Sequence, residues 1–212
     1  MLNDPGHELI DKIFDESTPV DKEALAFALT LMEESDRGCV LVGAAHLDEE
    51  VQTLLRETFE NAVEIVRKAV DPLLKGGFAP LGSFAARTKL ALALGLISSE
   101  VHDALEKLRA LRNTLAHTTG PFRLSEEQVG SILPKLPTHV QKFWKVTRLV
   151  TEQLVAEMKA SGKDKGKEIA ILSSYRTQFS MAVGFLENEI LKSRAVVRKR
   201  RIRTQQQDQP DK

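Results

Sequence analysis

The chain has 212 residues, of which 42% are hydrophobic, and no apolar run approaches the ~20 residues needed to cross a bilayer. We therefore expect a soluble protein of one or two domains with no membrane contact. The single cysteine, Cys39, excludes an internal disulfide framework and a zinc site built from several cysteines. Because the first residues also lack the pattern of a secretory leader, the expected location is the cytoplasm.

Charge is distributed unevenly along the chain. Thirty basic and thirty acidic residues give a net charge of zero, but the segment 192–203 contains seven lysines and arginines and no acid. The remainder therefore carries a net charge of about −7, which is not typical of a nucleic-acid-binding domain. We expect a body over residues 1–191 and a basic, partly disordered tail over residues 192–212. The tail could contact phosphates or simply support a helix end.

The first half of the chain predicts five helices. Nearly every periodic segment has helical spacing, and none shows the alternation or the β-branched richness of a strand, so the fold class is all-α. N-capping residues and glycine or proline breaks place the helices at about residues 21–34, 36–59, 61–70, 83–95 and 99–117. The segment 71–82 contains two prolines and three glycines, which predicts an ordered loop.

The second half predicts three more helices. The pattern Ser125–Gln128 fits a capping box at the start of a short helix. A longer helix follows over about residues 138–160, then a polar linker over 161–167 and a last helix through Tyr175–Ile190. The end of the chain, 205–212, is expected to be disordered. About eight helices should thus form a single compact multi-helix domain with an extended basic C-terminal helix.

The segment Arg112–His117 closes the fifth predicted helix and contains an arginine on an apolar face. At 100° per residue, Arg112 falls within the arc formed by Val101, Leu105, Leu108 and Leu115. A guanidinium cannot lose its charge near neutral pH, so it needs a partner if it faces the core. Asp48 lies at the edge of the apolar stripe of the second predicted helix. We therefore predict a structural ion pair between Asp48 and Arg112.

The same segment resembles the Arg-polar-x3-His motif of the HEPN superfamily of helical domains, and the resemblance implies a HEPN-like helical bundle core. In active members the motif cleaves RNA. Carried onto this chain, His117 would be the general acid/base, Arg112 would stabilise phosphate charge and Asn113 would orient the substrate. On an ideal helix Arg112 and His117 point about 140° apart, so they would converge only at a helix end or a dimer interface. A solvated helix face is the simpler interpretation, and metal-independent ribonuclease activity is the alternative.

A second resemblance covers residues 21–130. Its motifs are Ser35-Asp36-Arg37-Gly38, Leu47-Asp48-Glu49-Glu50, Leu54-Leu55, Asp71-Pro72-Leu73-Leu74, Pro80-Leu81-Gly82-Ser83-Phe84, Arg87-Thr88-Lys89-Leu90, Leu94-Gly95-Leu96-Ile97 and Leu111-Arg112-Asn113. Their order and spacing are similar to those of the mannitol-operon repressor family, the MtlR-type proteins. The resemblance implies a non-enzymatic repressor of bacterial transcription without a recognised DNA-binding motif. A homodimer and a regulatory protein partner are therefore expected.

Other site types have weaker support. A helix-turn-helix over residues 84–112 is disfavoured, because Glu100 and Asp103 would bring negative charge into the major groove. The histidines lack the spacing to acids that predicts a metal cage, so no metal ion and no cofactor are expected. The candidate nonspecific contacts to nucleic acid are the tail residues Arg194, Arg198, Lys199, Arg200, Arg201 and Arg203.

Overall fold

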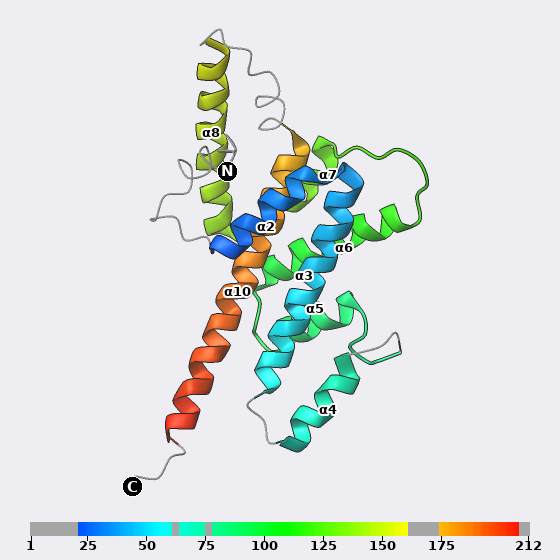
Figure 1. Cartoon of the computed structure of the whole chain (residues 1–212), viewed down its shortest axis with the longest axis vertical. Coiled ribbons are helices and arrows are strands. Elements are labelled where there is room, and N and C mark those ends of the chain that lie inside the picture. Colours follow the sequence, from blue (N-terminus) through cyan, green and yellow to red (C-terminus); the bar gives the residue numbers. More distant parts are fainter. Residues whose placement is uncertain (1–20, 61–63, 75–77, 161–173, 208–212) are drawn as a thin grey trace, which may run out of the picture.

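The computed structural model describes residues 21–60, 64–74, 78–160 and 174–207. All regular elements within these ranges are helical, so the all-α prediction is confirmed. The elements are α2 (Lys22–Glu33), α3 (Asp36–Phe59), α4 (Glu64–Leu74), α5 (Phe84–Ala93), α6 (Ser99–Ala116), α7 (Glu126–Ile132), the 3-10 helix η1 (Leu133–Lys135), α8 (Thr138–Ala160) and α10 (Tyr175–Gln207). They form one domain, in which the other helices gather around α3 and α10 (Figure 1).

Capping side chains determine where several helices begin. The hydroxyl groups of Ser35, Ser83 and Ser98 each accept a hydrogen bond from the backbone amide three residues later, and these serines open α3, α5 and α6. At α7 the side chain of Gln128 accepts a hydrogen bond from the amide of Ser125 at 2.8 Å, as the predicted capping box requires. The predicted starts of these helices are therefore confirmed.

The end of α4 differs from the sequence-based expectation. The helix continues to Leu74 with Pro72 in its last turn, whereas a loop was predicted from Asp71 onward. Val70 and Leu74 lie four residues apart on one side of the helix and both are buried. Their burial offsets the single backbone hydrogen bond that a proline removes so near a helix end. The predicted start of this helix, at Asn61, lies outside the described residues.

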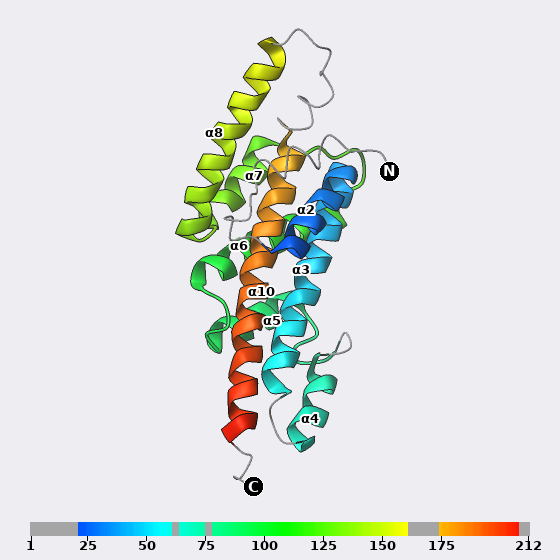
Figure 2. The ribbon, with the colours of Figure 1, turned by 60° about the vertical axis from the view of Figure 1, so that its left-hand side comes forward.

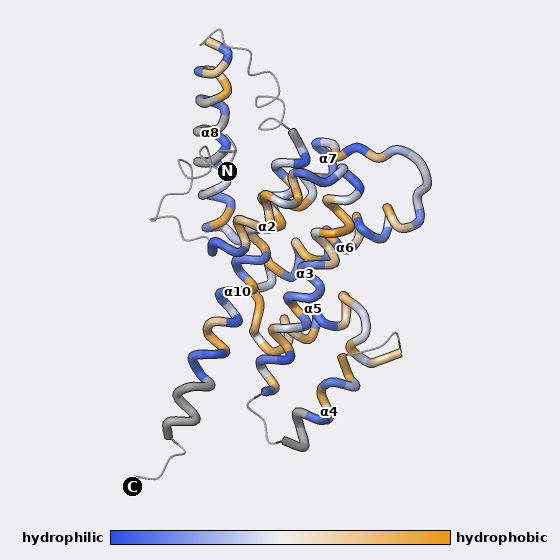
Figure 3. Tube along the Cα trace, viewed as in Figure 1, coloured by the Kyte–Doolittle hydropathy of each residue, from blue (hydrophilic) through white to orange (hydrophobic). Residues whose placement is uncertain are grey.

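The central element of the bundle is α10, which contacts α2, α3, α6 and α7. Every residue from Phe179 to Asn188 is buried, as expected for a helix surrounded by others. Most other helices alternate between hydrophilic and hydrophobic residues, which is the pattern of helices with one face on a core (Figure 3). The predicted boundary between body and tail, at residue 192, falls inside α10, which runs unbroken to Gln207.

The start of helix α8 packs on the bundle. Val140 is buried, and the ring of Trp144 meets that of Phe185 edge to face with 6.1 Å between the ring centroids. His139 lies 3.1 Å from Glu189 of α10. The rest of α8 extends beyond the other helices in both views (Figures 1 and 2). Among the described helices, none combines the length and apolarity needed to span a bilayer.

Candidate functional site

Arg112 lies on the surface near the end of α6, not in the core. Its side chain is exposed, and its Nη1 donates a hydrogen bond to Oδ1 of Asn113 at 3.2 Å. The buried stripe shifts around the helix along its length, and in the last two turns it is formed by Leu108, Leu115 and the half-buried Leu111. The centre of this later stripe is about 70° from Arg112 at 100° per residue. The prediction averaged the apolar face over the whole helix, and it therefore wrongly assigned Arg112 to the buried face.

The predicted partner of Arg112, Asp48, is bound by Arg87 of α5 instead. Nε and Nη2 of Arg87 donate hydrogen bonds to the two carboxylate oxygens of Asp48, at 2.8 Å and 2.6 Å. Nη1 donates a third to the carbonyl of Leu81 at 2.8 Å. The side chain of Arg87 is 8% exposed and that of Asp48 is 27% exposed. The predicted Asp48–Arg112 pair is therefore wrong. Arg87 instead connects α5 to Asp48 of α3 and to the loop before α5.

His117 stands apart from the other two residues of the HEPN-like motif. It is the C-cap residue of α6 and its side chain is exposed. Within the described part of the chain, no hydrogen bond joins it to Arg112 or Asn113. The structure of one chain thus brings Arg112 and Asn113 together but not His117, and the ribonuclease site stays a prediction.

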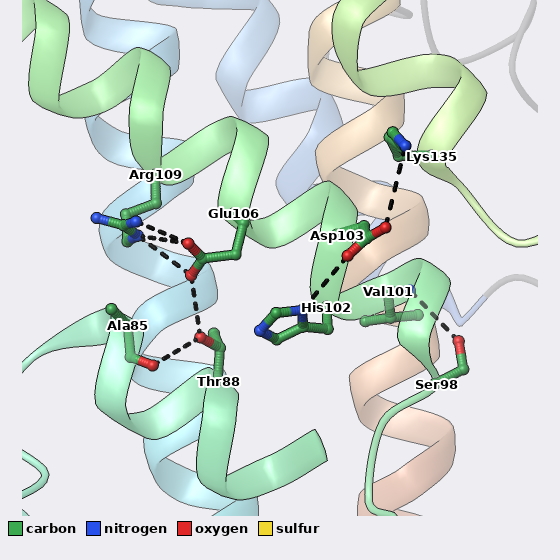
Figure 4. Close-up of polar contacts among 9 residues, drawn as sticks. All are labelled: Ala85, Thr88, Ser98, Val101, His102, Asp103, Glu106, Arg109 and Lys135. Carbon is green, nitrogen blue, oxygen red and sulfur yellow. Dashed lines mark hydrogen bonds and ion pairs between the residues drawn. The ribbon is translucent and has the colours of Figure 1, made fainter. Parts of the chain in front are cut away.

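A second polar cluster lies where α5 packs on α6 (Figure 4). The carboxylate of Glu106 accepts hydrogen bonds from Nη2 of Arg109 at 2.7 Å and from Thr88 at 3.4 Å. The hydrogen bond and charge of Arg109 lower the pKa of Glu106. His102, beside it, lies 3.5 Å from Asp103. The Glu106–Arg109 ion pair is half-buried and extends to the fully buried Thr88.

The sequence did not predict the contact between His46 and Glu187. Nε2 of His46 on α3 lies 2.8 Å from Oε1 of Glu187 on α10, and the ring of Phe27 stacks on the imidazole at 3.7 Å. Burial disfavours a charged ring, but the hydrogen bond and charge of Glu187, with the charges of Glu50 and Glu49, outweigh it and raise the pKa of His46. The available signal was Glu187, the first acid after the mostly apolar stretch 179–186, because a buried carboxylate requires a partner.

Two arginines of the basic segment are held by α3. The guanidinium of Arg194 binds Glu50 and Glu57, the latter at 2.8 Å, and Arg198 binds Glu57 at 2.6 Å. These hydrogen bonds lower the pKa of Glu57 in spite of its burial. Lys199 and Arg200 are exposed, and the side chains of Arg201 and Arg203 lie outside the described ones.

Neither a metal centre nor a reactive thiol emerges from the described residues. No group of three or more histidine, cysteine or acidic side chains is placed to hold a metal ion there. Sγ of Cys39 lies 3.3 Å from the hydroxyl of Ser180, and burial raises the pKa of the thiol to about 11. The thiol therefore stays protonated near neutral pH and acts as a small packing group.

Comparison with known proteins identifies the family of this chain. Residues 30–165 match the family model described as mannitol repressor, MtlR. The chain belongs to the mannitol repressor family. The mannitol operon repressors of Escherichia coli K12 and of Escherichia coli O6:H1 are each 31% identical to this MtlR-family chain over 93 residues, which is 44% of this chain and 47% of theirs. The match thus spans about half the length of these curated relatives.

A solved structure shares the fold of the MtlR-family chain. The X-ray structure of the MtlR-HPr complex from Escherichia coli contains a chain that aligns with a TM-score of 0.53 and 21% identity. The alignment covers 78% of this chain and 98% of that one. At this identity the likeness shows the fold alone.

The motifs that carried the resemblance to MtlR proteins are largely architectural. Asp48 and Arg87 belong to two of them and bind each other, so the pair joins motifs 39 positions apart. In the first motif, Asp36 accepts a hydrogen bond from the amide of Leu124 at 2.9 Å. Arg37 donates to the carbonyls of Leu115 and Gly120 at 2.8 and 3.0 Å, and so holds the end of α6. Several residues of these motifs thus hold helices and loops of the fold together.

Proposed function

We propose that this MtlR-family protein is a cytoplasmic repressor-type regulator of bacterial transcription that acts through a protein partner and not as an enzyme. The observation that carries the proposal is the match to the mannitol repressor family over residues 30–165. The shared fold with an MtlR chain that was crystallised with HPr supports a protein partner. The architectural role of Asp48 and Arg87 also supports it, because motif residues that build the fold require no catalytic role.

The partner that we propose is the HPr protein of the same organism. The neighbouring Escherichia coli structure is a complex of MtlR with HPr, and its MtlR chain is covered almost completely by the alignment. We propose in addition that two copies of the chain associate. Light scattering of the purified protein over a range of concentrations tests this: a molar mass near 47 kDa, twice that of the 23.6 kDa chain, is expected for a dimer.

The regulatory role is tested by deleting the gene in its native organism and sequencing the transcripts. A small set of operons, including those for mannitol uptake and use, should rise several-fold and return to the starting level on complementation with the wild-type gene. Complementation with Arg112→Met is the matched control, because the exposed Arg112 has no structural partner but Asn113 among the described residues. An unchanged transcript profile after deletion would contradict the role.

The HEPN-type ribonuclease remains the alternative, and one observation favours testing it. Arg112, Asn113 and His117 all lie on the accessible end of α6, where a second copy of the chain could reach them. Purified protein is incubated with structured and with single-stranded RNA, beside His117→Ala and Arg112→Ala variants of verified fold. Cleavage that both substitutions abolish would replace the regulatory proposal, whereas intact RNA would leave it in place.

A further inference from the structure

One face of α8 points away from the bundle. The start of α8 is joined to the other helices by Val140, which is buried, and by Trp144, whose ring meets that of Phe185. At 100° per residue, Leu149 lies about 180° from Val140 and about 140° from Trp144 around the helix axis. Leu149 is 66% exposed, and α8 extends past the other helices (Figures 1 and 2). A second molecule can therefore reach this outer face without displacing the bundle.

Six exposed residues form a stripe along the outer face of α8. The members of this α8 stripe are Lys142, Lys145, Leu149, Glu152, Gln153 and Ala156. At 100° per residue they all lie within an arc of about 100° that has Leu149 near its centre. A single exposed leucine is common on protein surfaces. What distinguishes Leu149 is its position in the middle of a charge pattern.

The charge changes sign along α8. Residues 138–151 contain two lysines and one arginine but no acid, whereas residues 152–160 contain two glutamates and one lysine. The exposed side chains of Lys142 and Lys145 have no hydrogen bond or ion pair within the described part of the chain. Glu152 and Glu157 each accept one hydrogen bond within α8, at 2.8 Å and 3.1 Å, and both are exposed. A carboxylate can accept several hydrogen bonds, so both glutamates can bind a further cation.

This charge pattern is complementary to itself when two copies of α8 run antiparallel. A two-fold axis beside Leu149, perpendicular to the plane of the two helices, places the two leucines opposite each other. At 1.5 Å per residue, Lys145 then lies within about 2 Å, along the helix direction, of Glu152 of the second copy. Both are displaced from Leu149 toward the same side of the stripe, by about 40° and about 60°. Lys142 meets Glu157 of the second copy in the same way on the other side.

Other arrangements of the same helix lack this complementarity. A parallel pair would place Lys142 and Lys145 beside the same lysines of the second copy, and like charges at an interface are unfavourable. We propose that the α8 stripe is the interface between two copies of this chain, paired antiparallel about Leu149. The inference rests on the proposed association of two copies and adds the surface through which they associate. Because each copy contributes the same residues, the contact closes as a dimer.

The interface is tested first at its centre. Light scattering measures the molar mass of the full-length protein from about 1 µM to about 1 mM. Leu149→Glu brings two negative charges together at the two-fold axis and should weaken association at least tenfold. Val196→Glu is the matched control, because Val196 is a 48% exposed apolar residue of α10 outside the stripe, and it should associate as wild type does. Circular dichroism verifies the fold of both variants.

Charge reversal tests the proposed ion pairs. The K142E/K145E variant reverses the lysines of the first half of α8, and the E152K/E157K variant reverses the glutamates of the second half. Each variant alone should associate at least tenfold more weakly than wild type, because like charges then face each other. An equimolar mixture should recover association, since each reversed half then faces a half of opposite charge. A mixture that stays monomeric, with both variants folded, would overturn the ion pairs.

Disulfide formation tests the direction of the pair. Chains with K145C are mixed with size-tagged chains with E152C and oxidised, and disulfide-linked mixed dimers should form because the two positions lie opposite each other. K145C alone should not cross-link, since its two copies would lie about 12 Å apart along the pair. Cys39 is buried, so it does not compete. Cross-linking of K145C to itself but not to E152C would overturn the antiparallel arrangement.

The outcomes separate this interface from the proposals on which it rests. A dimer that Leu149→Glu leaves unchanged would refute the interface and leave the proposed association intact. A chain that stays monomeric over the whole concentration range would refute both. Binding of HPr to the Leu149→Glu variant is measured in parallel, and retained HPr binding would leave the regulatory proposal in place in either case.

Discussion

Arg87 is the charged side chain on which the packing of α3 against α5 depends. Its guanidinium is 8% exposed and satisfies three acceptors, two on Asp48 and one on the carbonyl of Leu81. Since it cannot lose its charge, removal of either member of the pair leaves polar groups without partners. Arg112, in contrast, is exposed and donates one side-chain hydrogen bond to its neighbour Asn113. The two arginines should therefore differ greatly in their contribution to stability.

Matched substitutions test this difference. Arg87→Met should lower the free energy of unfolding by about 3 kcal/mol, because it leaves Asp48 as an uncompensated, mostly buried carboxylate. Arg112→Met, which makes the same chemical change at the surface, should alter it by less than about 0.5 kcal/mol. Urea unfolding at pH 7 measures both. Equal destabilisation by the two substitutions would contradict the assignment of Asp48 to Arg87.

His46 makes the stability of the protein depend on pH in a defined direction. Its folded-state pKa is raised above the ordinary value by Glu187, Glu50 and Glu49 in spite of burial. The contribution of the charged ring is therefore fully present below about pH 6.5, the value in the unfolded chain, and is lost as the pH rises through the folded-state pKa. His46→Gln should thus cost more stability at pH 6 than at pH 9.

Urea titrations of wild type and variant across pH 5.5–9 provide the measurement. The control repeats the His46→Gln substitution in a Glu187→Gln background. Without that carboxylate, the difference between the cost of His46→Gln at pH 6 and at pH 9 should largely disappear. The same cost of His46→Gln at pH 6 and at pH 9 would show that the imidazole acts by packing against Phe27 alone.

At the scale of the elements, the close approach of α2 to α10 depends on Gly184. A Cβ atom at this position would lie 2.9 Å from Cβ of Ala28 and 3.0 Å from the carbonyl oxygen of Ala24. Gly184→Ala should therefore destabilise the protein by up to ~2 kcal/mol, since an overpacking cost of about 1–3 kcal/mol exceeds the gain in helix propensity of roughly 1 kcal/mol.

Gly130 of α7 is the matched control for Gly184. A Cβ there has no atom within 4 Å, so Gly130→Ala should raise the melting temperature slightly through helix propensity alone. Thermal unfolding followed by circular dichroism compares the two variants. A stabilising effect of Gly184→Ala would show that α2 and α10 can separate without loss.

The sequence allowed the elements to be predicted where local chemistry determines them. Ser35, Ser83 and Ser98 define helix starts through hydrogen bonds within four residues, so capping rules suffice. The partner of Asp48 depends on which helix packs against α3, and no local pattern contains that information. The same limit explains the missed His46–Glu187 contact, whose members are 141 positions apart.

At the scale of the whole molecule, residues of the family motifs contribute contacts between helices. The motif residues Asp36, Arg37, Asp48 and Arg87 hold helices together. Two helices extend from the bundle, α8 through its later part and α10 through its C-terminal end (Figure 1). A fold stabilised through its motifs can thus present different surfaces to partners without losing its architecture.

If this MtlR-family protein acts through a protein partner, as we propose, it should bind HPr of the same organism, and isothermal titration with purified HPr tests this most directly. The expected result is saturable binding with a dissociation constant of roughly micromolar or tighter, unchanged by nuclease treatment. The absence of binding at HPr concentrations of about 100 µM, with both proteins folded, would contradict a regulatory role through HPr.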